Sequence, residues 1–408
     1  MEESISKVPI EEEQPQFKKN YQVFRFIGGN LVSFFGDQIY MIALPLIVLA
    51  ITGSPLSMGI VAALERLPIL LQPLAGVLAD KLNRKRILLF CDAGRFIISG
   101  IMGILYLLDN LYIWEIYLAA LVMGILTQLY NTSQFASVPK LVRKNDLQLV
   151  NSINTGIFQT AVFIAPGLGG ILISIFNPGV GLLINSLSYA MGFLVVFSLN
   201  ITHEKLEKGS GWLAELKEGF VFVIKEKSIL YTNLAMLFSV FGTTLFITML
   251  VVHLKLSAGF SSAEIGYLLS IGGGAAIAGA LLTNFIKKAF TYRMILFTGG
   301  TIGGVSIIGF GLADSFVLLA VMNAIGTISA AIMSTCIVTI RQILSPEQLL
   351  GRVGATSRFM TWLLMPLAAL TAGVIAETFG TGHAIVIGGL IAALSSFIYL
   401  APSLKAIN

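Results

Sequence analysis

Residues 76–86 of the chain read Gly76-Val77-Leu78-Ala79-Asp80-Lys81-Leu82-Asn83-Arg84-Lys85-Arg86. One acidic and four basic side chains fall in the last seven of these positions, and the long segments on both sides are mostly apolar. A short basic segment between two long apolar ones is typical of a loop at a membrane surface. This loop therefore indicates a membrane protein and marks the point between two spans.

The overall composition supports this interpretation. Of the 408 residues, 56% are hydrophobic and 12% are charged, whereas a soluble domain carries about 25% charged residues. A water-soluble fold of this length could not bury so much apolar surface, so lipid must be the solvent for much of the chain. The net charge of +5 does not indicate a nucleic-acid partner, because the distribution of basic residues has another explanation.

Twelve stretches are long and apolar enough to cross a membrane as helices, which takes about 20 residues each. They are too long for β-strands, so we predict an all-α integral membrane protein with twelve transmembrane helices. Their approximate limits are Tyr21–Ile51, Leu56–Ala79, Ile87–Leu108, Tyr112–Ala136, Val150–Phe176, Gly179–Leu199, Ile229–Val252, Ala263–Phe285, Met294–Leu312, Phe316–Val338, Val353–Ala376 and Gly382–Leu400.

The basic residues predict the orientation of these helices. If the N-terminus is inside, the outer loops contain one of the 26 basic residues, Lys255, and three others, Arg66, Arg95 and Arg358, lie within spans. All remaining basic residues are then on the inner side, as the positive-inside rule requires. Residues 2–13 are acidic and polar, unlike a signal peptide, so we expect residues 1–20 to be a cytoplasmic tail.

The chain divides into two related halves. Val150–Pro166 leads the fifth span as Leu350–Pro366 leads the eleventh, and residues 76–85 resemble residues 279–288. We therefore predict two pseudo-symmetric six-helix bundles, 21–199 and 229–400, followed by a cytoplasmic tail at 401–408.

The segment 200–228 between the halves is predicted to be a cytoplasmic linker. Within it Trp212, Leu216, Phe220 and Val223 recur at helical spacing. This pattern indicates an amphipathic helix, which would either lie on the inner membrane surface or pack against the bundle.

Residues 76–86 resemble the signature of the major facilitator superfamily between its second and third helices, which is Gly, two residues, a small residue, Asp, basic, any residue, Gly, Arg, basic. Asn83 stands where the second glycine is usual, and asparagine tolerates a left-handed backbone well. The resemblance implies the fold of that family, in which two six-helix bundles move against each other.

Further segments resemble the macrolide-efflux and enterobactin-exporter branch of the family. They are Phe35-Gly36-Asp37-Gln38, Ala43-Leu44-Pro45-Leu46, Thr52-Gly53-Ser54-Pro55, Arg66-Leu67-Pro68, and Asp92 with Arg95. Residues 165–170 resemble the helix-five motif of antiporters, with Ala165 in place of the usual glycine. Pro166, Gly167 and Gly170 are the residues that the resemblance identifies with this motif.

This resemblance implies a secondary active transporter in a bacterial plasma membrane, namely a proton-coupled exporter of a hydrophobic or amphiphilic compound such as a macrolide or other drug. A siderophore exporter and a lipid or lysophospholipid flippase are alternatives with the same fold. The expected partners are the substrate, protons and membrane lipids, and we expect a monomer. No catalytic grouping, nucleotide loop or His/Cys cluster points to an enzyme, a cofactor or a metal.

The resemblance also implies an inner gate. In the family, the aspartate at the position of Asp80 faces the start of helix eleven, here Arg352–Arg358, where helix polarity and arginines favour a carboxylate. The alternative is that residues 80–86 only fix the topology by their charge. The residues expected at the gate are the motif residues Gly76, Asp80, Arg84 and Lys85. Asp92, Arg95 and Arg358 are added to them because they lie only about 8 to 12 Å from the inner face at the rise of an α-helix.

Charged residues deep in the spans are candidates for proton coupling, because burying charge in lipid is costly. Asp37 lies about 16 Å from the inner boundary and Glu65 about 14 Å from the outer one, on adjacent helices. Low polarity favours the neutral carboxyl group and a nearby Arg66 favours the ionised one. We expect Asp37 and Glu65 to carry protons; the alternative is a static ion pair with Arg66.

The second half contains no acid deep within a span. Its cavity wall is expected to be apolar and aromatic, which suits bulky, greasy substrates. The candidate residues are Phe238, Phe241, Phe246, Met249, Trp362 and Met365.

Overall fold

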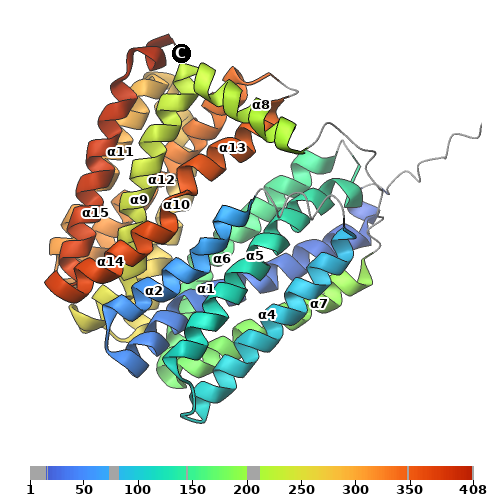
Figure 1. The fold of residues 1–408 in the computed structure, drawn as a ribbon, viewed down its shortest axis with the longest axis vertical. Helices are drawn as coiled ribbons and strands as arrows, with labels where there is room; N and C mark the ends of the chain where they lie inside the picture. Colours follow the sequence, from blue (N-terminus) through green and yellow to red (C-terminus); the bar gives the residue numbers. More distant parts are fainter. Residues whose placement is uncertain are drawn as a thin grey trace, which may run out of the picture.

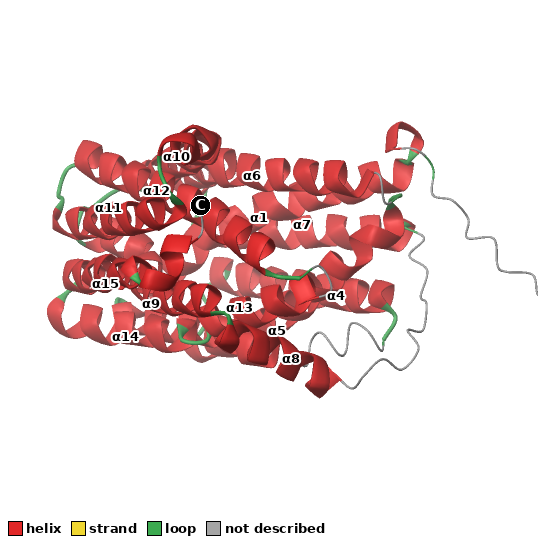
Figure 2. Cartoon of the chain, turned by 90° about the horizontal axis from the view of Figure 1, so that it is seen from above, coloured by secondary structure: helices red, strands yellow, loops and turns green. Residues whose placement is uncertain are grey.

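The computed structural model describes residues 15, 17–72, 82–143, 146–199, 212–346 and 349–406. The regular structure of these residues is entirely helical, and the helices form two groups that are plainly separate in the ribbon (Figure 1). Figure 2 shows the same helices from above, running roughly parallel along the long direction of the view.

The first bundle contains the helices of the N-terminal half. Its elements are α1 (Tyr21–Thr52), α2 (Pro55–Arg66) with the 3₁₀ turn η2 (Leu67–Leu71), α4 (Arg84–Leu107), α5 (Ile113–Leu141), α6 (Leu147–Ile175) and α7 (Pro178–Ser198).

The second bundle contains the helices of the C-terminal half. Its elements are α9 (Lys227–Leu256), α10 (Ser262–Ala289), α11 (Tyr292–Leu312), α12 (Phe316–Leu344), α13 (Leu350–Trp362), α14 (Met365–Phe379), α15 (Thr381–Ser395), and the 3₁₀ turns η5 (Ser396–Leu400) and η6 (Pro402–Ala406).

Eleven of the spans in the described ranges are long and apolar enough to cross a membrane, with α13 and α14 counted together as one. The break between these two helices precedes Pro366 at the start of α14, where proline lacks the backbone donor that a continuous helix needs. The second predicted span is described only as far as residue 72, as α2 and η2.

Helix α1 starts, and the turn η6 ends, on the same face of the molecule. This face is called the terminal face, and the opposite one is called the distal face. Short turns close the distal face. Gly53 ends α1 with φ of 63°, which glycine adopts freely, and Ser54 caps α2 by accepting a hydrogen bond from Ser57 N. Ser261 and Glu264 form a reciprocal capping box on α10, which satisfies free N–H groups at the helix start.

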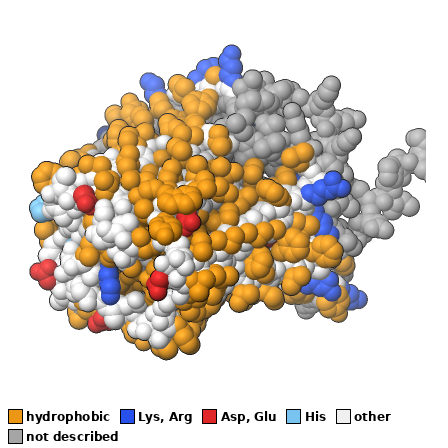
Figure 3. Space-filling view, turned by 60° about the horizontal axis from the view of Figure 1, so that its bottom comes forward, with side chains coloured by type: hydrophobic (Ala, Val, Ile, Leu, Met, Phe, Trp, Pro, Cys, Tyr) orange, Lys and Arg blue, Asp and Glu red, His pale blue; other side chains and the backbone are white. Residues whose placement is uncertain are grey.

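The outside of the molecule is mainly apolar. Large hydrophobic side chains such as Leu281, Phe285 and Phe379 are about 70% exposed (69%, 71% and 69%), and Figure 3 shows hydrophobic side chains over most of one face. Such extensive exposed apolar surface fits a lipid environment rather than water. The two cysteines, Cys91 and Cys336, are buried and unpaired in different bundles.

The bundles touch at their distal ends and diverge toward the terminal face (Figure 1). Helix α2 packs on α14, and α6 packs on α10. At the first contact a Cβ atom on Gly59 would lie 2.6 Å from Gly373 Cα, so the two backbones meet at a distance that only glycine permits.

A charged contact lies at the distal edge of the same helix pair. Glu377 of α14 accepts hydrogen bonds from Ser54 Oγ (2.8 Å) and from Leu56 N (3.2 Å), at the N-terminus of α2. A carboxylate is favoured at a helix N-terminus, so this contact holds the distal ends of the bundles together.

The linker contains helix α8 (Trp212–Lys225), which packs on α13 of the second bundle. Val223 is fully buried with Val353 and Ile229, and Arg352 forms an ion pair with Glu218. Of the two alternatives for the amphipathic segment, the structure therefore has the helix packed against the bundle.

Candidate functional site

Asp37 is held by the neighbouring helix of its own bundle. The Tyr189 hydroxyl of α7 donates a hydrogen bond of 2.7 Å to Asp37 Oδ1 on α1. The helices approach closely here because Gly36 has no side chain: a Cβ atom would lie 2.2 Å from Ser188 Oγ. The sequence Gly36-Asp37 thus positions the carboxylate against a tyrosine.

Asp92 and Arg95 form a buried ion pair on α4. Arg95 Nη2 donates to Asp92 Oδ1 at 2.5 Å, and the two residues are 0% and 3% exposed. The guanidinium carbon lies 4.0 Å from the ring centre of Tyr130 and 4.4 Å from that of Tyr189, a cation–π arrangement. Tyr189 therefore contacts both Asp37 and Arg95.

Glu65 and Arg66 occupy the last turn of α2. Arg66 Nη1 donates to Ala62 O at 3.1 Å, and Glu65 interacts electrostatically with Arg66, with Tyr40 and with Asp37. Gly124 of α5 makes the approach possible, because a Cβ atom there would lie 2.3 Å from Glu65 O. The structure thus brings Asp37, Glu65 and Arg66 into one electrostatic group.

The five residues Asp37, Glu65, Arg66, Asp92 and Arg95 are called the buried charge cluster here. The cluster holds three carboxylates and two guanidiniums. Asp92 is paired with Arg95, and Glu65 lies beside Arg66. Within the described ranges no basic side chain forms an ion pair with Asp37 or with Glu65; Arg95 acts on Asp37 and Arg66 acts on Glu65 through space. The cluster therefore has one carboxylate more than it has guanidiniums, and Asp37 and Glu65 are its two carboxylates without an ion pair to a described basic side chain.

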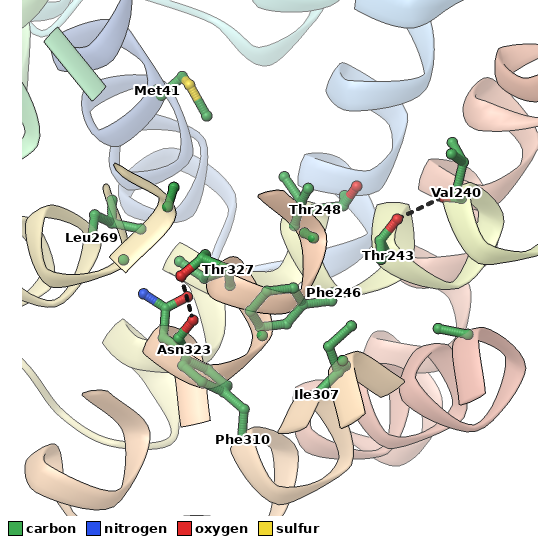
Figure 4. Close-up of a pocket in the computed structure, with 18 of the residues that line it drawn as sticks. Met41, Val240, Thr243, Phe246, Thr248, Leu269, Ile307, Phe310, Asn323 and Thr327 are labelled. Carbon is green, nitrogen blue, oxygen red and sulfur yellow. Dashed lines mark hydrogen bonds between the residues drawn. The ribbon is translucent and has the colours of Figure 1, made fainter. Parts of the chain in front are cut away.

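A cavity of about 570 Å³ lies between the bundles. Its walls come from α1, α2 and α6 on one side and from α9, α10, α11, α12 and α15 on the other. Figure 4 shows Phe246, Phe310 and Ile307 on one part of the wall and Asn323 and Thr327 on another. This volume lies in the range of sites for drug-sized molecules, about 300–1,000 Å³.

Four of the predicted site residues line this cavity: Glu65, Arg66, Pro166 and Phe246. Gln38, the neighbour of Asp37, also lines it, whereas Asp37 itself faces α7. The buried charge cluster therefore borders the cavity through Glu65 and Arg66 and extends behind its wall.

Of the six residues predicted for an aromatic and methionine wall, Phe246 lies at this cavity. Met249 is fully buried in the core and Phe241 packs against that core. Phe238 is 45% exposed. The Arg358 guanidinium lies over the ring of Trp362. Phe238, Trp362 and Met365 do not line the cavity.

Two of the seven inner-gate residues, Gly76 and Asp80, lie outside the described residues. Lys85 caps the end of α7 by donating to Phe197 O (2.8 Å) and Leu199 O (2.6 Å), and Arg84 starts α4. Arg358 is exposed on α13 of the other bundle. Asp92 and Arg95 interact electrostatically with Asp37 in the first bundle rather than with Arg358.

The helix-five motif lies at the contact between the bundles. Gly167 N donates to Ser270 Oγ of α10 at 2.8 Å, and a Cβ atom on Gly170 would lie 2.3 Å from Ser262 O and 2.9 Å from Gly266 Cα. Pro166 lines the cavity just beside this contact. The motif thus combines a residue of the cavity wall with a close contact between α6 and α10.

Sequence reasoning missed Tyr40, Tyr130, Tyr189, Gln38 and Asn323. Their polar groups lie within apolar spans, and a polar residue inside a span indicates a functional or packing role. That signal is weak for uncharged side chains, since it does not say which neighbour each one meets.

The comparisons with known proteins agree with this architecture. Residues 26–369 match the Major Facilitator Superfamily. The chain is 23% identical to an uncharacterized MFS-type transporter, YfiS, of Bacillus subtilis strain 168, covering 95% of this chain and 94% of the relative. It is 21% identical to macrolide efflux protein A of Streptococcus pyogenes (89% and 91% covered) and 29% identical to the enterobactin exporter EntS of Shigella boydii serotype 4 (68% and 66% covered).

Among solved structures, a bacterial homologue of the iron transporter ferroportin in an inward-facing state superimposes with a TM-score of 0.75 at 16% identity, covering 93% of this chain and 98% of that one. This likeness concerns the fold. The predicted fold class and the predicted family resemblance are both confirmed, and the chain belongs to the major facilitator superfamily.

Proposed function

We propose that the protein exports a hydrophobic or amphiphilic small molecule from the cytoplasm and that inward movement of protons drives the export. The supporting observation is the extra negative charge of the buried charge cluster, in which Asp37 is hydrogen-bonded to a tyrosine hydroxyl and forms no ion pair with a described basic side chain. Macrolide efflux protein A and EntS, two of the similar proteins, are by name an efflux protein and an exporter.

Proton binding at Asp37 would change the balance of the cluster. With all five groups ionised the cluster has one net negative charge; a proton on Asp37 makes it neutral. A neutral cluster is cheaper to enclose in a low-polarity interior than a charged one. Protonation would therefore favour movements that close the cluster away from water, and deprotonation would reverse them.

The orientation follows from the charges of the loops. On the face seen in Figure 3, most of the Lys and Arg side chains lie toward the right and upper edges of the view, and the Asp and Glu side chains lie in its left half. By the positive-inside rule, the terminal face would be cytoplasmic. The contacts between α2 and α14 and between α6 and α10 would then close the cavity to the outside, so that substrate enters from the cytoplasm.

The inner gate remains part of this proposal. In the outward-open state, Asp80 would approach the start of α13 near Arg358 and close the terminal face, while Glu377 would leave the N-terminus of α2. The two contacts would alternate, since each one closes the face that the other leaves open.

Inside-out membrane vesicles test the coupling. Substrate uptake into vesicles energised with a proton gradient should fall to the passive rate when a protonophore collapses the gradient. Uptake that continues unchanged without the gradient would mean that the protein is not proton-driven.

Export of an iron chelator is a second candidate, favoured by the similarity to enterobactin exporters. A panel of toxic compounds tested on a deletion strain would separate the two candidates, because a drug exporter changes the sensitivity of the strain and a chelator exporter changes its growth under iron limitation.

A further inference from the structure

The polar side chains of the cavity wall differ in whether their hydrogen bonds are already made. Thr243 and Thr327 line the cavity, but each hydroxyl donates at 2.9 Å to the carbonyl oxygen four residues earlier in its own helix. These hydroxyls have little left to offer a ligand as donors. Figure 4 draws the bond from Thr327 to Asn323 as a dashed line, together with the second, longer bond of Thr243, to Val240 O at 3.2 Å.

Two carboxamides on the wall still have free hydrogen-bonding capacity. Gln38 of α1 is half-buried and lines the cavity, and its side chain makes no hydrogen bond to any residue in the described part of the chain. Asn323 of α12 donates from Nδ2 to Leu268 O at 3.1 Å, which leaves its Oδ1 as an acceptor. One carboxamide comes from each bundle.

The position of Asn323 depends on a glycine. A Cβ atom on Gly272 of α10 would lie 2.4 Å from Asn323 Nδ2, so any larger residue would displace the amide. Asn323 is only 6% exposed, and a buried amide needs its hydrogen bonds. The bond to Leu268 O fixes the amide plane, and the remaining acceptor faces the cavity side.

The charge of the wall is balanced. Among the described residues that line the cavity, the charged ones are Glu65 and Arg66, which are adjacent and of opposite sign. Most of the other lining residues are apolar, including Met41, Leu269 and Phe310. A ligand with several charges of one sign would lose its hydration here without enough opposite charges to replace it.

We propose that the substrate is an uncharged, largely apolar molecule with carbonyl, hydroxyl or amide groups, bound by Gln38 on one bundle and Asn323 on the other. Gln38 supplies both a donor and an acceptor, and Asn323 supplies an acceptor. This inference rests on the proposed function as a transporter of small molecules, and it narrows the substrate class. It disfavours a multiply charged iron chelator at this site.

The position of Gln38 also places the proposed substrate site next to the proposed proton site. Consecutive residues of an α-helix point about 100° apart, so Asp37 meets Tyr189 while Gln38 meets the cavity. A substrate held by Gln38 is therefore one residue away from the carboxylate proposed to carry the proton.

Thermal unfolding of the purified full-length protein in lipid nanodiscs tests the inference, because a bound ligand raises the unfolding temperature. The probes are corticosterone and chloramphenicol, which are uncharged and carry hydroxyl and carbonyl groups, ethidium, which is a cation, and carboxyfluorescein, which carries several negative charges. We expect stabilisation by the uncharged probes. Gln38→Met should weaken their binding about five- to tenfold, the value of one lost hydrogen bond. Thr335→Val, which removes a hydroxyl of the same helix as Asn323 that is exposed, lies outside the cavity wall and is bonded to Ala331 O, should change binding less than about twofold.

The inference is wrong if ethidium or carboxyfluorescein stabilises the protein and the uncharged probes do not. It is also wrong if none of the probes stabilises the protein. A Gln38→Met variant that binds the uncharged probes as tightly as the native protein would contradict it as well. Binding is measured without a proton gradient and so does not depend on coupling. Uncharged probes that bind through Gln38, together with transport that ignores the gradient, would refute the proton-coupling proposal and leave this inference standing.

Discussion

The Tyr189 hydroxyl donates a 2.7 Å hydrogen bond to Asp37, and the ring of the same tyrosine lies against the Arg95 guanidinium at 4.4 Å. One side chain of α7 therefore joins the Asp37 carboxylate of α1 to the Asp92–Arg95 pair of α4. A hydrogen bond donated to a carboxylate favours its ionised form, so under the proposed coupling Tyr189 would help determine when Asp37 accepts a proton.

Replacing Tyr189 by Phe should shift the pH dependence of transport. Without the donated hydrogen bond Asp37 accepts a proton more easily, so the pH of half-maximal transport should move upward. The measurement is transport rate against pH in proteoliposomes. Tyr399→Phe is the matched control, since Tyr399 is a fully buried tyrosine of the other bundle whose hydroxyl has no hydrogen-bond partner among the described residues; its profile should stay in place. A profile that shifts downward or not at all in Tyr189→Phe would contradict the role of this bond.

Asp92→Asn should destabilise the first bundle and impair transport. It leaves the Arg95 charge buried without its partner, and breaking a buried ion pair in this way costs about 3–5 kcal/mol. The unpaired guanidinium would also act more strongly on Asp37 and keep it ionised. Thermal unfolding in detergent measures the first effect. The double variant Asp92→Asn/Arg95→Met should recover part of the lost stability, and a double variant less stable than Asp92→Asn alone would argue against the pairing as the cause.

Glu377→Gln should loosen the distal face. The change removes the charge that accepts hydrogen bonds from Ser54 Oγ and Leu56 N, and hydrogen bonds to charged groups are worth more than those to neutral ones. The population open at the distal face should increase several-fold, as measured by the distance between spin labels on α2 and α14. Glu264→Gln serves as control, because Glu264 caps its own helix at Ser261. Equal distance distributions for Glu377→Gln and the native protein would rule out a closing role for this contact.

Gly170→Leu should prevent closure of the distal face. Its side chain would occupy the space of Ser262 O and Gly266 Cα on α10, and backbone atoms cannot move aside as a flexible side chain can. Transport should be lost while a cysteine placed in the cavity becomes reactive from the distal side. Gly156→Ala on the same helix meets nothing within 4 Å and should transport normally. Full activity of Gly170→Leu would mean that the tight contact between α6 and α10 is not needed.

Much of the fold could be predicted from the sequence, because the preference of a long apolar segment for lipid is a local property. The predicted limits of α7 and α11 differ from the observed ones by only a few residues. The proximity of Asp37 and Glu65 could also be predicted, since depth in the membrane follows from position along each helix.

The grouping of charges around a helix could not be predicted in the same way. Depth alone places Asp92 and Arg95 near the inner face together with Arg358, but it does not predict that Arg95 lies between the rings of Tyr130 and Tyr189. The cavity wall was equally difficult. Helix α9 is apolar on all sides, so the sequence does not show that Phe246 faces the cavity while Met249 is buried in the core.

The most direct test of proton coupling is the uptake of protons by proteoliposomes that contain the native protein or Asp37→Asn, recorded with a pH-sensitive dye while substrate is exported. We expect substrate-dependent proton movement in the native protein and none in Asp37→Asn, with the variant folded and still able to bind substrate. Substrate-dependent proton movement at the native rate in Asp37→Asn would contradict the central claim that Asp37 carries the proton.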